Sequence, residues 1–297
     1  MFYNINSYIK ALQDIKESLK TAKEGSMKSK RELIEDRKKF ARILSEIMES
    51  SASAVLSAGF NTSFLNVCIA FGGYSGLVEV TAETVYRARP GGSAYILPLE
   101  AGLSVHPVYL VPYVPGSSVK GVARAAFLET AILRGVEAWE AERCARAVFG
   151  DTEDAGVSAL VFFDAYPVGW DSENGLLWGD VVTPHYPGAR AEWEAQPRPA
   201  LQLSLAPGVE LRFTVLVDEP LLRERLRTWG CCWVLDKLPG GRHGPLGLAA
   251  GLLVYALERL GIGSKTTRGY GRLRVTGLRA THCTSANTRG KQLVRGR

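Results

Sequence analysis

Cysteine and histidine are scarce in this chain of 297 residues, and their scarcity argues against several kinds of site. The cysteines are scattered and form no C-x-x-C pair, which argues against a zinc knuckle and against a disulfide framework. Most of them are therefore expected to be buried as small hydrophobic residues. We expect no metal site and no cofactor. The cysteines are Cys68, Cys144, Cys231, Cys232 and Cys283.

Long apolar runs are also missing. No stretch of about 18 apolar residues occurs, and the opening MFYNINSYIKALQDIKESLK is too polar for the apolar region of a signal peptide. We therefore expect neither membrane insertion nor secretion, and the expected compartment is the cytoplasm. A hydrophobic content of 46% can still bury a full core, which predicts a globular protein of one elaborated domain or two small ones.

Acidic residues are absent from the last part of the chain. Between Arg259 and Arg297 there are ten basic residues and no acidic one, although the whole chain has a formal net charge of only +6. A stretch of one charge sign attracts a polyanion and gains affinity by counterion release when it neutralises phosphates. Residues 282–297 are predicted to be a basic flexible tail, so the interest lies in the basic residues that precede them.

Hydrophobic periodicity predicts an α+β fold. Residues 1–58 have apolar residues at helical spacing and are expected to form an N-terminal helical extension, with a break at KEGSMKSK, that serves for packing or for docking. Deleting residues 1–50 is expected to spare the fold. Residues 59–281 are expected to form the main domain, with insertions at about 72–114 and 167–208.

The main domain is predicted to follow the order strand, helix, strand, strand, helix, strand. Its predicted elements include strands at SFLNVCIAF, LVEVTAETVYRA, SALVFFDAYPV, VELRFTVLV and GYGRLRVTGL, and helices at GSSVKGVARAAFLETAILRG and GPLGLAAGLLVYALERLG. This order is typical of ferredoxin-like and RNA-recognition-motif-like folds, with an antiparallel sheet, helices on one face and the other face open for single-stranded RNA. The second insertion is rich in Pro, Gly and Trp and is expected to be irregular.

The most unusual stretch is GIGSKTTRGYG, residues 261–271, which we call the glycine loop. Its glycines allow positive φ angles and a close approach of the backbone to a ligand, while Lys265, Thr266 and Arg268 supply donors. Phosphate is the natural ligand for such a loop. A P-loop is not supported, because Ser264 precedes Lys265 and the loop connects a helix to a strand. A structural turn is the simpler alternative, but a turn needs only one or two glycines.

A second motif begins the first helix of the domain, in VPYVPGSSVKGVAR. Ser117 or Ser118 can cap this helix, and free amides at its start could bind a phosphate. Lys120 and Arg124 lie one turn apart on one face. A capped core helix with two solvated basic residues explains the motif equally well.

These two motifs resemble the hallmark motifs of the RAMP superfamily of type III CRISPR effectors. The stretches ALVFFDAYP and VVTPHYPGA lie between them, and TPHY, residues 183–186, makes the chain most similar to the sixth subunits of Cmr (type III-B) complexes. The resemblance spans roughly residues 64–275.

The resemblance implies a non-catalytic subunit at the head of a ribonucleoprotein filament in antiviral defence, near the 3′ end of the CRISPR RNA. The implied partners are CRISPR RNA, target RNA, the backbone RAMP subunit and the head RAMP subunit, with no membrane partner. The implied RNA or filament contacts are Ser117, Ser118, Lys120, Arg124, His185, Tyr186, Gly263, Lys265, Thr266, Arg268 and Tyr270.

An enzymatic alternative stays open at this point. Some RAMP relatives cleave RNA, and His185 with Tyr186 or a loop lysine could act as base and acid in a metal-independent ribonuclease. A hydrogen-bonded loop residue is the simpler interpretation of His185, so we expect no catalytic residue and no enzymatic activity. A third alternative is a protein scaffold whose basic loop contacts acidic partners.

Overall fold

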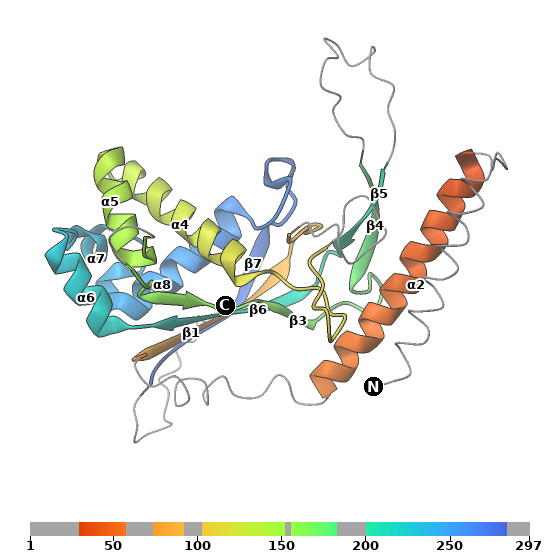
Figure 1. Cartoon of the computed structure of the whole chain (residues 1–297), viewed down its shortest axis with the longest axis horizontal. Coiled ribbons are helices and arrows are strands. Elements are labelled where there is room, and N and C mark those ends of the chain that lie inside the picture. The colour runs from red at the N-terminus through yellow and green to blue at the C-terminus, as the bar shows by residue number, and fades with distance from the viewer. Residues whose placement is uncertain (1–29, 58–73, 92–102, 152–155, 183–199, 284–297) are drawn as a thin grey trace, which may run out of the picture.

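The computed structural model describes residues 30–57, 74–91, 103–151, 156–182 and 200–283 (Figure 1). Among these residues, no helix is long and apolar enough to cross a membrane. The main elements, in chain order, are α2 Lys30–Ser57, β1 Gly76–Thr84, α4 Gly116–Leu133, α5 Ala138–Phe149, β2 Leu160–Phe162, β3 Tyr166–Gly169, β4 Leu177–Val182, β5 Ala200–Leu205, β6 Glu210–Val217, α6 Glu219–Thr228, α7 Trp233–Lys237, α8 Gly244–Tyr255 and β7 Leu273–His282.

The main sheet is antiparallel, with the strand order β2-β6-β1-β7 and with β3 paired to β6. Together with α4 and α8 these strands follow the predicted order β1, α4, β2, β6, α8, β7. The α+β ferredoxin-like prediction is therefore confirmed. One predicted strand, SALVFFDAYPV, is divided into β2 and β3, which pair with opposite ends of β6. The predicted strand at residues 64–72 lies outside the described residues.

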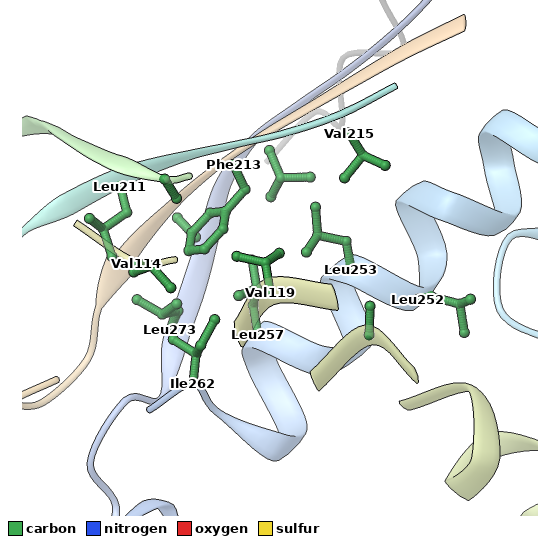
Figure 2. Close-up of a cluster of buried hydrophobic side chains, with 14 of the residues drawn as sticks. Val114, Val119, Leu211, Phe213, Val215, Leu252, Leu253, Leu257, Ile262 and Leu273 are labelled. Carbon is green, nitrogen blue, oxygen red and sulfur yellow. The ribbon is translucent and has the colours of Figure 1, made fainter. Parts of the chain in front are cut away.

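Helices α4 and α8 pack on the same face of this sheet (Figure 1). On β1 the residues Val78, Val80 and Ala82 alternate with polar ones and are buried in the same hydrophobic core as the two helices. Figure 2 shows Phe213 of β6 projecting into this core. The two-residue period of the strands thus places their apolar residues against the helical layer.

The opposite face of β1 differs from the expected RNA-binding sheet. Its residues are Leu77, Glu79, Thr81 and Glu83, none of them aromatic. The two glutamates pair with arginines of β7, with N···O distances of 4.0 and 2.8 Å. RNA-recognition motifs stack bases on aromatic side chains of the sheet. This part of the sheet provides carboxylates that are already paired, so the described surface of β1 does not support the expected open RNA face.

Helix α2 is part of the hydrophobic core. Leu44 and Met48 are 1% exposed and belong to the same cluster as the sheet. Glu49 of α2 accepts a hydrogen bond of 2.8 Å from the amide of Leu176, just before β4. Figure 1 shows α2 beside β4 and β5. The expectation that the fold survives deletion of residues 1–50 needs correction, because this deletion would uncover the core.

The second insertion contains regular structure, contrary to the expectation. Strands β4 and β5 form a two-stranded antiparallel sheet, with Trp178 opposite Ser204 and Asp180 opposite Gln202. An isolated bridge between Ala88 and Leu205 joins this hairpin to the segment that follows β1. The backbone groups of β4 and β5 are hydrogen-bonded to each other. The composition of the insertion did not indicate this pairing.

A disulfide joins Cys144 of α5 to Cys231, across 87 residues of sequence. Cys283 is also disulfide-bonded, while Cys232 is exposed and free. The expectation of no disulfide framework was therefore wrong. Spacing along the sequence could not predict the pair, because packing of α5 beside the segment before α7 brings the two cysteines together.

Replacing Cys144 and Cys231 with alanine is expected to lower the free energy of unfolding by about 2–4 kcal/mol, because the open chain gains freedom when unfolded. Urea denaturation of the oxidised protein measures the change. The matched control is Cys232→Ala, which removes an exposed free thiol and should shift stability by less than about 0.5 kcal/mol. Equal stability of the double variant and the control would contradict a stabilising role of the bond.

Candidate nucleic-acid interface

The glycine loop is fastened to the segment that follows β1. Within the loop, the amide of Ile262 donates to the carbonyl of Gly271 at 2.8 Å. The amide of Gly271 donates to the carbonyl of Arg87 at 2.8 Å, and the amide of Ser264 donates to the carbonyl of Arg89 at 3.0 Å. These last two bonds place the loop directly beside two arginines that are far from it in sequence.

The glycines of the loop are needed for this packing. Gly263 has φ +94° and Gly271 has φ +69°, and an added Cβ would lie 2.2 Å from the carbonyl oxygen of Arg89 and 1.9 Å from that of Ile262, respectively. Gly269, with φ +88°, has open space around it. The expectation that the glycines allow a ligand to approach therefore changes: at Gly263 and Gly271 the neighbour is the chain's own backbone.

The tip of the loop presents donors at fixed positions. Lys265 has φ +61°, in the left-handed region that few residues other than glycine adopt. A short 3-10 turn, Thr266–Arg268, follows it, and the amide of Arg268 donates to the carbonyl of Lys265 at 2.9 Å. Lys265 and Thr266 are half-buried, whereas Arg268 is exposed.

Cations crowd together beside the loop. Burial lowers the pKa of Lys265, and the guanidinium groups of Arg89 and Arg268 lower it further, while Asp180 opposes the effect. Burial also lowers the pKa of Arg89, opposed by Asp180 and Tyr270. Arg89 is only 6% exposed, and its Nε has no hydrogen-bond partner among the described residues. A site in which cations repel one another in this way favours an anion between them.

One carboxylate holds the site together. Asp180 of β4 accepts a hydrogen bond of 2.8 Å from the guanidinium of Arg87, and it also accepts one from the hydroxyl of Tyr270 in the glycine loop. Asp180 is 7% exposed. Burial raises the pKa of Tyr270, and the hydrogen bond to Asp180 raises it further. Asp180 thus joins the hairpin, the loop and the segment after β1.

The start of α4 is built differently from the prediction. The residue before the helix is Pro115, whose side chain makes no capping hydrogen bond. The amide of Gly116 donates to the carboxylate of Asp164 at 2.7 Å, so Ser117 and Ser118 do not serve as the expected cap. An added Cβ at Gly116 would lie 2.4 Å from the carbonyl oxygen of Phe162, which explains the glycine by packing.

The basic residues of α4 are only partly available. Lys120 and Arg124 are both half-buried, and Arg124 forms an ion pair with Glu142 of α5. The two motifs do share one core, because Val119 of α4 and Ile262 of the glycine loop belong to the same cluster (Figure 2). The structure thus connects the motifs through buried residues, while Arg124 has a partner within the protein.

The histidines give little support to an enzymatic site in the part of the chain that is described. His106 packs among tyrosines, His243 is exposed before α8, and His282 pairs with Glu219 at 2.9 Å. His185 and Tyr186, the candidate base and acid of the enzymatic alternative, lie outside the described residues. Within those residues, no group of three His, Cys, Asp or Glu side chains could hold a metal ion.

Several residues of the site were missed by sequence reasoning. Arg87 and Arg89 stand in YRARP, where two basic residues alternate after an aromatic one, and this pattern could have indicated them. Tyr86 and Trp178 are exposed beside them. Asp180 had no signal, because its role depends on pairing between residues about 90 apart in the chain.

Comparisons with known proteins identify similar sequences. The RAMP superfamily profile matches residues 99–274, more than half of the chain and including both motifs. The chain is 36% identical over 139 residues to the CRISPR system CMR subunit Cmr6 of Saccharolobus solfataricus, and this alignment covers 46% of the chain. It covers 44% of that relative, so the match spans less than half of the relative's length.

One solved structure is similar in fold, and a second aligns only weakly. A chain of the cryo-EM structure of the type III-B Cmr-beta bound to cognate target RNA aligns with a TM-score of 0.54 and 23% identity, over 88% of this chain and 79% of that one. The crystal structure of Cmr6 from Pyrococcus furiosus aligns with a TM-score of 0.39 and 20% identity, over 67% of this chain and 97% of that one. The profile match over more than half of the sequence shows that this chain belongs to the RAMP superfamily.

Proposed function

We propose that this chain is an RNA-binding subunit of a type III-B CRISPR effector and that the glycine loop binds the phosphate backbone. The observation that carries the proposal is that backbone bonds hold Arg89 against the glycine loop, which itself contains Lys265 and Arg268. Each cation that neutralises a phosphate releases condensed counterions, which supplies affinity without regard to base sequence. The similarity to Cmr6 supports this class of subunit.

The carboxylate of Asp180 is compatible with a phosphate ligand. A free carboxylate would repel phosphate, but this carboxylate is 7% exposed and accepts hydrogen bonds from Arg87 and Tyr270. Its negative charge is therefore engaged by hydrogen bonds within the protein. Arg89 and Lys265 interact electrostatically with this carboxylate and with each other.

The place of the subunit follows from its resemblance to the sixth Cmr subunit. We place it at the head of the filament, near the 3′ end of the CRISPR RNA, in contact with CRISPR RNA, target RNA and the backbone and head RAMP subunits. Its role there is structural, and cleavage belongs to another subunit. Ser117, Ser118, Lys120, His185 and Tyr186 remain proposed contacts of this assembly.

The test is a salt series of single-stranded RNA binding, followed by fluorescence anisotropy. Replacing Lys265 and Arg268 with alanine should weaken binding and reduce the slope of log K against log salt by roughly 1.4, about 0.7 for each lost phosphate contact. The matched control is Arg223→Ala/Arg227→Ala, which removes two exposed charges from α6. An unchanged slope in the loop variant would remove the loop from the RNA site.

The integrity of the RNA on a gel tests the enzymatic alternative in the same samples. Intact RNA without added metal is the result expected of a structural subunit. Discrete products that disappear in His185→Ala would overturn the non-catalytic role and favour a metal-independent endoribonuclease.

A further inference from the structure

Two exposed aromatic rings contact Arg87, whose carbonyl is bonded to the glycine loop. Tyr86 follows β1 and is 42% exposed, and Trp178 of β4 is 37% exposed. The guanidinium carbon of Arg87 lies 5.2 Å from the centroid of each ring. One cation therefore contacts two aromatic rings that come from separate parts of the sequence.

This arrangement is fixed before any ligand binds. Arg87 is held by its 2.8 Å contact with Asp180, so its planar group is kept in place beside the rings. The ring of Tyr270 packs edge-on against Tyr86, with centroids 5.5 Å apart and an interplanar angle of 81°. The rings of Tyr86 and Trp178 thus keep their positions without a large loss of freedom on binding.

The position of the rings indicates what covers them. Tyr86 and Arg87 directly precede Arg89, and the backbone of Arg89 is bonded to the glycine loop through Ser264. Tyr270 of the same loop packs against Tyr86, so the rings and the donors of the loop belong to one bonded group of residues. Proteins that bind single strands stack successive bases on aromatic side chains next to a basic groove.

We propose that Tyr86, Arg87 and Trp178 form a stacking platform for unpaired bases of the RNA whose phosphates bind the glycine loop. The inference rests on the proposed function and adds to it a second kind of contact. The occupant is an unpaired nucleobase, and the contact is to its flat face. Since every base has such a face, the platform accepts any base and adds affinity without sequence preference.

The experiment compares two ligands of equal charge, a single-stranded RNA and the same chain with abasic positions. The wild type should bind the RNA about 5- to 150-fold more tightly than the abasic chain. Trp178→Ala should lose most of this difference and leave the abasic affinity unchanged, whereas Trp178→Phe should retain much of it. A fluorescent base analogue should be quenched by the wild type and less so by Trp178→Ala.

The chain offers a matched control in Trp139 of α5, which is 66% exposed and has the guanidinium of Arg143 5.5 Å from its centroid. Trp139→Ala should change neither affinity. Loss of RNA and abasic binding to the same extent in Trp178→Ala would overturn the platform, because Trp178 would then only position the loop. If the wild type and every variant bind the RNA and the abasic chain with the same affinity, the platform is also overturned. The rings would then be assigned to a protein contact. Failure of the wild type to bind either ligand would instead reject the proposed function itself, and the platform with it.

Discussion

Replacing Leu44 and Met48 with alanine is expected to lower the free energy of unfolding by about 2–5 kcal/mol for each residue. Both side chains are 1% exposed and lie one helical turn apart on the face of α2 that packs into the core. Their removal leaves a cavity as well as less buried apolar surface, so the cost exceeds that of transfer alone. Urea denaturation followed by circular dichroism measures the loss.

The control for this prediction is on the other face of the same helix. Arg42 and Glu46 are exposed, also one turn apart, and replacing both with alanine should change stability by less than about 0.5 kcal/mol each. Similar stability of the two double variants would show α2 to be an appendage. That result would restore the original expectation that deleting residues 1–50 spares the fold.

The result also matters for the proposed RNA site. Glu49 of α2 bonds to the amide of Leu176, and β4 begins at the next residue. The same strand carries Trp178 and Asp180. A weakened α2 should therefore loosen the hairpin and reduce RNA affinity even though no residue of α2 is assigned to RNA.

Local patterns explain how much of the fold the sequence could predict. Buried residues recur along β1 and β6, and α8 is apolar along its length, because these residues face one core. Such patterns can be recognised within a short stretch of sequence. The membership of α2 in the core was not visible, because its periodic apolar face requires a partner but does not identify it. The β4–β5 hairpin and the Cys144–Cys231 bond likewise depend on pairing between distant segments.

The residues of the candidate site also fall into those that local sequence could indicate and those that depend on contacts between distant segments. The glycine loop could be found because glycines and cations are adjacent in sequence, whereas Arg87 and Asp180 belong to the site only through long-range bonds. Arg124 stays a predicted RNA contact, but the sequence could not show that its guanidinium pairs with Glu142, which belongs to a different helix.

Replacing Gly271 with alanine is expected to destabilise the protein far more than the same change at Gly269. Both residues have positive φ, +69° and +88°, so each substitution costs roughly 1–2 kcal/mol of backbone strain. Only at Gly271 would the new Cβ also lie 1.9 Å from a backbone oxygen, that of Ile262. We expect a total loss of more than about 3 kcal/mol for Gly271→Ala by chemical denaturation. Equal losses for the two variants would contradict the packing role assigned to Gly271.

The two variants also separate loop geometry from loop charge. To accommodate Gly271→Ala, residues 262 and 271 must move apart within the loop, and the 2.8 Å bond from the amide of residue 271 to the carbonyl of Arg87 is then expected to break. Lys265 would no longer be held next to Arg89, so RNA affinity at a temperature where the variant is folded should fall although every cation is still present. Gly269→Ala should retain that affinity, because nothing lies within 4 Å of its added Cβ. Unchanged binding by folded Gly271→Ala would mean that positive charge alone, without the fixed geometry of the loop, is sufficient for RNA binding.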